Sequence, residues 1–263
     1  MTEINQLLAL MARLRDPEMG CPWDRAQTYA SIVPFTIEEA YELADAIARN
    51  DHSELRQELG DLLFQVVFYA QLAQEEGAFT FADIVKTIME KMIRRHPHVF
   101  GDVKYRDHAE QTAAWEHIKA TERDGKTASV LDHVPLALPA ATRAVKLQRK
   151  AARVGFDWAE PTPVLAKIEE ELAEIRDVLT AGADSARVAE EIGDFLFACA
   201  NLARHLRIDP EAALRAANAK FERRFRRIEN WLAESGRTPE HATLAEMDAL
   251  WERAKAEERG ETA

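Results

Sequence analysis

Two pairs of acidic residues in the first half of the chain have a spacing that could assemble a cation site. One pair is Glu39 with Glu42, and the other is Glu58 with Asp61. Residues at positions i and i+3 share a helix face, so two such helices packed antiparallel would bring four carboxylates together. These carboxylates would repel one another unless a cation neutralised them, and an all-oxygen, anionic ligand set suits Mg²⁺ or Mn²⁺. The spacing therefore predicts a site for a hard divalent cation.

The same four-acid pattern returns in the second half of the chain. Its members are Glu171, Glu174, Glu191 and Asp194. Glu171 and Glu174 lie about two turns inside a predicted helix that begins at Thr162 and Pro163, where no capping role is available. Repetition of one constellation in the same order favours cation binding over a chance gathering of surface acids.

Simpler roles stay open for a single acidic pair, which is more often part of a solvated helix face. Thr36 and Glu39 fit a capping box. Glu58 and Asp61 could be acids near a helix N-terminus, where the helix dipole favours them. A di-iron or di-manganese carboxylate site is disfavoured, because such sites use Glu-x-x-His pairs and this sequence contains none.

A basic segment follows each quartet of acids. The segments carry Lys91, Arg94 and Arg95 in the first half and Lys220, Arg223 and Arg224 in the second. A solvated basic face explains either segment alone. Beside cation-binding carboxylates, Lys and Arg would instead contact phosphate oxygens, so the combination favours a metal-bound polyphosphate. Trp115 and Trp251 could stack on a base, although a lone Trp is more often part of a core.

The two halves differ in the charge beside their acids. One turn before the acid pairs, on the same faces, the second half carries Lys167 and Arg187, whereas the first carries Phe35 and Glu54. Positive charge at these positions would attract phosphate groups. We therefore expect the second site to be the stronger catalyst.

The elements that position these residues are predicted to be helices throughout. Apolar residues recur at helical spacing and no segment shows a convincing alternation of strand type. Helices are expected at 2–15, 36–49, 53–75, 81–95, 110–123, 139–153, 163–180, 185–206, 210–234 and 243–258. Gly and Pro interrupt the pattern near the middle of the chain. The predicted fold is all-α, with two tandem helical-bundle domains related by an internal repeat, at residues 1–124 and 139–263, and a linker at 125–138.

Composition limits the class of protein further. The chain has 263 residues, with 46 acidic and 34 basic side chains and a formal net charge of -12. This excess of acid disfavours nucleic acid and anionic membranes as partners. Cys21 and Cys199 lie far apart without metal-ligand spacing, and no leader or membrane-spanning segment is evident, so a reduced, cytoplasmic protein is expected.

At this point the residues resemble a known family. Glu-Glu-x-x-Glu followed by Glu-x-x-Asp, at 38–42 with 58–61 and again at 170–174 with 191–194, is similar to the motif of MazG, the all-α nucleoside triphosphate pyrophosphohydrolase. The flanking stretches 20–24, 94–100, 154–158 and 220–225 strengthen the likeness, which extends over essentially the whole chain. The resemblance implies a dimeric, Mg²⁺-dependent enzyme that hydrolyses nucleoside triphosphates to monophosphate and pyrophosphate, broad in base, with roles in nucleotide-pool cleaning and stress response.

The resemblance also assigns site residues by position. Metal ligation falls on the second quartet, Glu171, Glu174, Glu191 and Asp194, and the first quartet matches the same motif. Nucleotide contacts fall on Lys167, Ile168, Glu169, Glu170, Glu171, Arg187, Val188, Ala189, Glu190, Asp194, Lys220, Phe221, Glu222, Arg223, Arg224 and Trp251.

A metal-assisted hydrolysis is the mechanistic hypothesis. Cation-binding carboxylates would orient the phosphates and a water molecule, while Lys220, Arg223 and Arg224 would neutralise charge on the departing pyrophosphate. Glu171 would act as a ligand, and its neighbour Glu170 could orient or deprotonate the water or be merely solvated. A noncatalytic nucleotide-binding regulator and a helical interaction module are the alternatives. No cluster of Asn or Gln along the sequence marks a reader of base edges.

An expectation about assembly comes from the segment 59–72, which is apolar nearly all round. Such a helix must be covered on every side. A symmetric homodimer would cover it.

Overall fold

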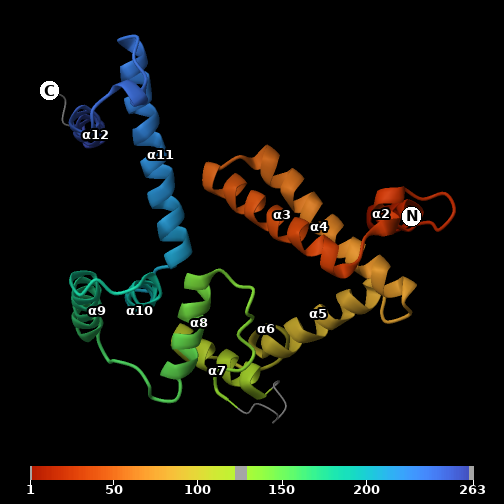
Figure 1. Ribbon diagram of the computed structural model, residues 1–263. Coiled ribbons are helices and arrows are strands. Elements are labelled where there is room, and N and C mark those ends of the chain that lie inside the picture. Colours follow the sequence, from red (N-terminus) through yellow and green to blue (C-terminus); the bar gives the residue numbers. More distant parts are fainter. Residues whose placement is uncertain (1, 122–128, 261–263) are drawn as a thin grey trace. The chain divides into compact units, whose positions relative to one another are not determined.

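The computed structural model describes residues 2–121 and 129–260, and every regular element in those ranges is a helix (Figure 1). The all-α prediction is confirmed. The chain divides into two compact units, Met1–Asp124 and Gly125–Ala263. Residues 125–128 of the expected linker, and the last two residues of the helix expected at 110–123, lie outside the described residues.

The first unit is built around an antiparallel pair of long helices, α3 and α4. Its elements are α1 (Glu3–Leu14), α2 (Pro22–Ala26), α3 (Tyr29–Arg49), α4 (His52–Glu75), α5 (Phe81–Arg95), α6 (Pro97–Phe100) and α7 (His108–Thr121). Asn50 adopts a left-handed conformation with φ of 55° and ends α3, and the Asp51 side chain then caps α4. This two-residue reversal places α3 beside α4 along most of their lengths.

The hydrophobic core of the first unit lies where α1 crosses this pair. Met11, Ile32, Val67, Phe68 and Leu72 are buried together there. Burial of a large apolar side chain contributes about 1.5–3 kcal/mol. This cluster therefore holds α3 and α4 at a fixed register, which matters because both helices carry acids of the first quartet.

Helix α3 begins seven residues earlier than the sequence predicted, at Tyr29 rather than at residue 36. Thr28 and Ser31 form the capping box, with Ser31 N–H donating to Thr28 Oγ1 and Thr28 N–H donating to Ser31 Oγ. The helix continues through Pro34, and the Thr36 hydroxyl donates to the Ile32 carbonyl one turn back. The capping box considered for Thr36 and Glu39 is therefore wrong, and Glu39 has no capping role.

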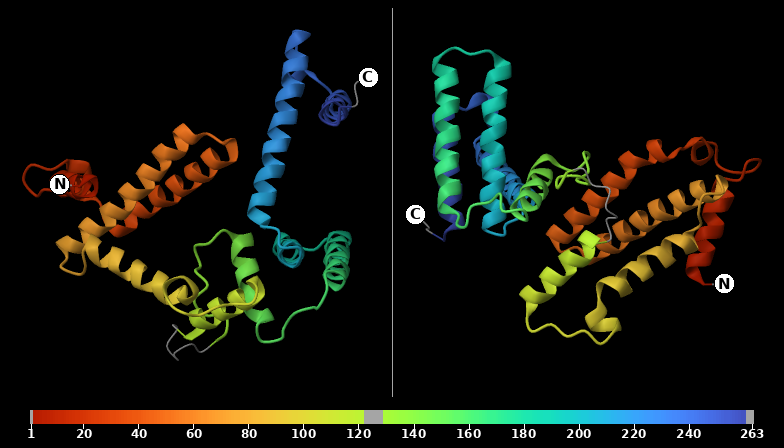
Figure 2. Two further views of the ribbon diagram at one scale, coloured as in Figure 1. Left: turned by 180° about the vertical axis from the view of Figure 1, so that it is seen from behind. Right: turned by 90° about the horizontal axis from the view of Figure 1, so that it is seen from below.

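The second unit repeats the helix pair. Its elements are α8 (Ala140–Ala152), α9 (Thr162–Thr180), α10 (Ser185–His205), α11 (Pro210–Glu234), the 3₁₀ turn η1 (Pro239–His241) and α12 (Leu244–Glu258). Helices α9 and α10 run antiparallel and α8 packs against α10, whereas the distal part of α11 pairs with α12 (Figure 2). Asp184 caps α10 by accepting from the Arg187 N–H. The acids of the second quartet thus stand on α9 and α10 as those of the first stand on α3 and α4.

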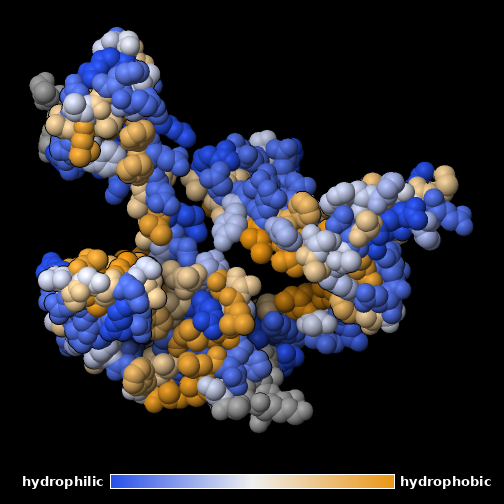
Figure 3. Space-filling model, in the orientation of Figure 1, coloured by the Kyte–Doolittle hydropathy of each residue, from blue (hydrophilic) through white to orange (hydrophobic). Residues whose placement is uncertain are grey.

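Several apolar side chains on these helices are exposed. On α4, Leu59 is 51% and Leu63 41% exposed, although the sequence predicts that this helix is covered on every side. Hydrophobic residues also gather along α3 and α5 on the surface of the first unit (Figure 3). Within the described part of the chain, no helix has the length and apolar character needed to cross a membrane.

Candidate metal centre

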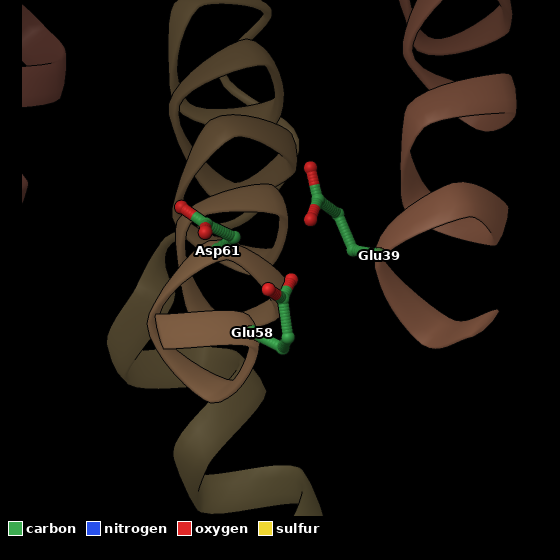
Figure 4. Close-up of side chains that lie close together, drawn as sticks. All are labelled: Glu39, Glu58 and Asp61. Atoms are coloured by element: carbon green, nitrogen blue, oxygen red, sulfur yellow. The ribbon is translucent and has the colours of Figure 1, made fainter. Parts of the chain in front are cut away.

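The first quartet brings three carboxylates to one point. Glu39 reaches from α3 toward Glu58 and Asp61 on α4, and one oxygen of each lies within 4.8 Å of the others (Figure 4). Burial, followed by repulsion from Asp61, raises the pKa of Glu39 above its ordinary value of 4.5. Burial and the neighbouring Glu42 likewise raise the pKa of Glu58. Burial and like charge both disfavour the ionised carboxylates, and a bound cation would offset both effects.

The second quartet forms the same cluster in a more enclosed setting. Oxygens of Glu171, Glu191 and Asp194 lie within 4.8 Å of one another. Glu171 is only 5% and Glu191 only 3% exposed, whereas Asp194 is exposed. The Oε2 atom of Glu171 is buried without a hydrogen-bond partner among the described residues. A buried, unpartnered carboxylate oxygen is costly, and a divalent cation would satisfy it.

The fourth acid of each quartet stands slightly apart. Glu42 and Glu174 are not among the atoms that gather within 4.8 Å. They still act on the clusters, because Glu42 raises the pKa of Glu58 through charge and a hydrogen bond. Burial, followed by repulsion from Glu171 and Glu191, raises the pKa of Glu174. Their roles as ligands remain predictions.

Two cations stand beside the second cluster. Lys167 Nζ lies 2.8 Å from Glu171 Oε1 and 2.9 Å from Glu170 Oε1. Arg187 pairs with both Glu190 and Glu191. Hydrogen bonds to Glu171 and then Glu170 raise the pKa of Lys167, so it stays charged. Each of these ion pairs joins residues at i, i+3 or i, i+4 on one helix, where side chains are neighbours.

The first cluster has different residues at the two positions that carry Lys167 and Arg187 in the second unit. Phe35, which corresponds to Lys167, packs edge-on against Trp23 with ring centroids 5.7 Å apart. Glu54, which corresponds to Arg187, pairs with Arg49. The structure therefore places positive charge beside the acids of the second unit and an aromatic ring and a further acid at the matching positions of the first.

The neighbours of these acids in the assigned nucleotide-binding stretches share their helices. Ile168 and Val188 are half-buried, and Glu169 and Ala189 are exposed. In the part of the chain that the structure describes, no hydrogen bond or ion pair joins these four side chains to the acid cluster, and their contacts with nucleotide remain predictions.

Among the described residues, no hydrogen bond or ion pair joins the basic segment of α11 to the acid cluster. Arg223 and Arg224 both pair with Glu258 of α12, at 3.0 and 2.6 Å. Arg224 also lies over the Trp251 ring, 5.4 Å from its centroid, and Phe221 contacts the same ring. Lys220 is exposed, and Glu222 pairs with Arg226 at 3.3 Å. The sequence prediction that these bases converge with the acids has no contact here to support it.

A cavity of about 730 Å³ adjoins the second cluster, and two residues in its lining, Gln148 and Asn201, were not predicted from the sequence. The lining also includes Lys167, Glu171 and Asp194, together with Trp158 from the stretch 154–158. Gln148 lies on α8 and Asn201 on α10. These two residues are far apart in the sequence and belong to no acidic or basic motif, so only the packing of α8 against α10 brings them together.

Fold and site together define a tandem all-α protein with a repeated carboxylate centre of the kind that binds divalent cations. The family model of the MazG nucleotide pyrophosphohydrolase domain matches the chain twice, at residues 27–100 and 160–228. Each match contains one acid quartet. The chain therefore belongs to the MazG nucleotide pyrophosphohydrolase family, and it is an enzyme of that kind.

Individual relatives cover most of the chain. The nucleoside triphosphate pyrophosphohydrolase of Escherichia coli K12 is 52% identical over 260 residues, which cover 98% of this chain and 99% of the relative. The nucleoside triphosphate pyrophosphohydrolase/pyrophosphatase MazG of Thermotoga maritima is 44% identical over 250 residues, covering 95% and 94%. A nucleoside triphosphate pyrophosphohydrolase of Mycobacterium tuberculosis is 37% identical over 153 residues, covering 57% and 45%.

Proposed function

We propose that this chain hydrolyses nucleoside triphosphates to monophosphate and pyrophosphate at the second acid cluster, with Mg²⁺ as the cofactor and Mn²⁺ as a substitute. The observation that carries the proposal is the buried Glu171 carboxylate, with one oxygen held by Lys167 and the other without a partner. The full-length similarity to enzymes named for this reaction gives it independent support.

The residues present suit a hard divalent cation. Glu171, Glu191 and Asp194 would hold it, and Glu174, which interacts electrostatically with Glu171 and Glu191, is the candidate for a fourth ligand. All candidate ligands are carboxylate oxygens, which is the donor set that Mg²⁺ and Mn²⁺ prefer. When bound, the cation polarises phosphate oxygens and lowers the pKa of an attacking water.

The chain's own side chains then divide the remaining work. Lys167 and Arg187 keep their charge and stand one helical turn from the ligands, where they attract the anionic phosphates. Glu170 is exposed and free of metal ligation in this proposal, so it is the candidate to accept a proton from water. Lys220, Arg223 and Arg224 have no ion pair with the cluster among the described residues, and in this proposal α11 of a second copy of the chain brings them to pyrophosphate.

The principal test measures pyrophosphate. Wild-type protein incubated with a panel of nucleoside triphosphates and Mg²⁺ should release pyrophosphate, and EDTA should stop the reaction. Glu171→Gln should lower kcat at least about 100-fold, because a removed ligand of this kind costs several kcal/mol of transition-state stabilisation. The matched variant Glu39→Gln should keep most of the activity. The reverse result would place catalysis in the first unit.

The alternative is a nucleotide-binding regulator. It predicts nucleotide binding by the wild type without any pyrophosphate release. Hydrolysis in ¹⁸O-labelled water would identify the phosphorus atom that water attacks. The label enters the monophosphate after attack at the α position and pyrophosphate after attack at the β position.

A homodimer is part of the proposal. The exposed apolar side chains Leu59 and Leu63 on α4, and Leu196 on α10 at 60% exposure, would be covered by a second copy of the chain. Sedimentation equilibrium should give twice the mass of one chain. A monomeric mass at micromolar concentration would exclude this part.

A role in clearing the nucleotide pool, as part of a stress response, is the physiological extension. It predicts that no single canonical base is strongly preferred and that altered bases are accepted. The measurement is kcat/KM for canonical and deaminated triphosphates in parallel. A preference above about 1,000-fold for one canonical base, which is more than 4 kcal/mol, would contradict it.

A further inference from the structure

The cavity beside the second cluster occupies a place that the first unit fills with apolar core. The repeat allows a direct comparison of α4 with α10, because Asp61 corresponds to Asp194. Seven residues further along stand Phe68 in the first unit and Asn201 in the second. Phe68 is 1% exposed within the hydrophobic core, whereas Asn201 is 9% exposed and lines the cavity.

A second substitution of the same kind occurs between α1 and α8. The loops after these helices differ in length, but in each unit the residue that follows the loop glycine donates a hydrogen bond to a carbonyl in the last turn of the helix, and we match the helix ends on this bond. Cys21 N–H donates to the Leu14 carbonyl at 2.8 Å, and Phe156 N–H donates to the Ala151 carbonyl at 3.1 Å. Three residues before these carbonyls stand Met11 and Gln148. Met11 is fully buried in the first core, and Gln148 is 8% exposed in the cavity wall.

The two amides in the second unit are oriented by their partners. Gln148 Nε2 donates to the Phe197 carbonyl at 2.9 Å, which leaves Gln148 Oε1 buried and without a partner among the described residues. Asn201 Oδ1 accepts from Arg204 Nε at 2.9 Å, so its NH₂ group is the side that can donate. Burying such groups with unused hydrogen-bonding capacity costs stability, and a polar ligand would recover it.

Aromatic side chains stand beside the amides on the loop after α8. Phe156 is 82% and Trp158 44% exposed, and both line the cavity. Asp157 between them pairs with Arg204 and lies 3.1 Å from His205, which ties the loop to α10. The hydrogen bond from Arg204 lowers the pKa of Asp157, so the tether stays charged. The loop is held in place even though its rings are exposed.

The matching ring of the first unit is already covered. Trp23 packs against Phe35, at the position where the second unit has Lys167. In the described part of the second unit, no aromatic ring packs on Trp158 in this way. An accessible indole, two amides with free capacity and a phosphate-attracting lysine therefore line one cavity.

We propose that this cavity binds the nucleoside part of the triphosphate, with the base stacked on Trp158 or Phe156 and its edge contacted by Gln148 Oε1 and Asn201 Nδ2. The proposal rests on the proposed function, because it places the phosphates at Glu171 and Asp194 on the same cavity. A volume of about 730 Å³ is within the range of small-ligand sites. One acceptor and one donor can pair with every nucleobase, since each base offers both on its edges. Broad base acceptance is therefore expected.

The test replaces each amide with the residue of the first unit, in the full chain. Asn201→Phe and Gln148→Met fill the cavity with side chains that the same fold buries in its other copy. The probes are α,β-methylene ATP, which resists cleavage between its α and β phosphorus atoms, and inorganic pyrophosphate, both with Mg²⁺ in calorimetric titrations. We expect about 10- to 100-fold weaker binding of the analogue, which is about 1.4 to 2.8 kcal/mol, and pyrophosphate affinity within about twofold of the wild type.

A surface variant keeps the test independent of core repacking. Trp158→Ala should weaken binding of the analogue about tenfold, because the base loses its stacking partner. The matched control in the first unit, Trp23→Ala, should leave the affinity for the analogue unchanged. Circular dichroism checks that each variant is folded. Unchanged analogue affinity in Trp158→Ala and in either amide variant overturns the proposal, as does an equal loss for the analogue and pyrophosphate. So does an equal loss in Trp23→Ala, or absence of analogue binding by the wild type.

The proposed function fails by a different result. If the wild type binds the analogue but releases no pyrophosphate from any triphosphate, hydrolysis is excluded while the nucleoside cavity is still supported by the binding data. If pyrophosphate is released normally and the cavity variants bind the analogue like the wild type, the reaction stands and the cavity assignment falls.

Discussion

Replacing Asp194 with Asn should make the metal-free protein more stable while removing its response to Mg²⁺. Asp194 lies within 4.8 Å of carboxylate oxygens of Glu171 and Glu191 and makes no ion pair among the described residues. Two unit charges at that distance repel by about 0.9 kcal/mol at the dielectric constant of water, so two neighbours contribute about 1.7 kcal/mol. Asp194 is exposed, and Lys167 and Arg187 form ion pairs with Glu171 and Glu191, so salt screening and these two cations together reduce the sum to about 1 kcal/mol or less.

The gain from metal binding should be larger than this relief. A cation at 100 times its dissociation constant stabilises the folded state by about 2.7 kcal/mol. Thermal unfolding followed by circular dichroism should therefore rank three samples, at roughly 4 °C per kcal/mol for a unit of this size. Metal-free wild type should melt first, metal-free Asp194→Asn about 4 °C higher, and wild type with Mg²⁺ about 10 °C above the metal-free wild type.

The matched control for this experiment is Asp177→Asn, which removes one exposed acid from α9 outside the cluster. This control should shift the melting temperature of the metal-free protein by no more than about 1 °C, and its response to Mg²⁺ should be that of the wild type. A lower melting temperature for metal-free Asp194→Asn, together with an intact Mg²⁺ response, would refute the view that these acids repel one another and share a cation.

Three further predictions concern elements that support the sites. Asp157→Asn should raise KM for nucleoside triphosphates and leave kcat nearly unchanged, because the loop loses its charged tether to Arg204; steady-state kinetics decides, and a fall in kcat alone would contradict it. Thr28→Ala should lower the free energy of unfolding by about 1 kcal/mol through loss of the α3 cap, measured by urea denaturation; no change would mean that the cap is dispensable. Arg237 lowers the pKa of Glu246 to about 2. Because that folded-state pKa lies below the ordinary 4.5, the stability from Glu246 is present above pH 4.5 and lost as the pH falls toward 2, so the difference in urea midpoint between wild type and Glu246→Gln should shrink from pH 6 to pH 3.

The parts of this protein that depend on local pattern were predictable from the sequence. Acids at i and i+3 had to share a helix face, and a short reversal between two amphipathic helices had to bring the faces together. The same reasoning gives the ion pairs of Lys167 and Arg187, which are one turn from their acids on the same helix. The helical spacing of apolar residues predicted the all-α fold, and the repeated order of motifs predicted the duplication.

Other parts depended on tertiary packing and were missed. The start of α3 was misplaced because Pro34 and Thr36 look like a helix boundary, while the true cap lies at Thr28 and the buried Ile32 holds the first turns in the core. The basic residues of α11 were expected to meet the acids, but their pairing with α12 is a long-range contact that spacing along one helix cannot reveal.

The amides of the cavity were missed for a related reason. Gln148 and Asn201 are isolated in the sequence and come together only through the packing of α8 on α10. A signal was available in the repeat, since Asn201 aligns directly with Phe68 through the acid motif. The match of Gln148 with Met11 required the backbone hydrogen bonds at the helix ends, because the intervening loops differ in length.

The replacement of Met11 and Phe68 by Gln148 and Asn201 has a consequence for how fast the protein is degraded. A fully packed apolar core is stable without any ligand. A core that contains a partly polar cavity gains part of its free energy of folding only when a ligand binds in that cavity. The second unit should then open, and meet proteases, more often when its ligand is scarce. Degradation of the whole chain would slow as the supply of the compound that it consumes rises and quicken as that supply falls, without any dedicated control of its degradation.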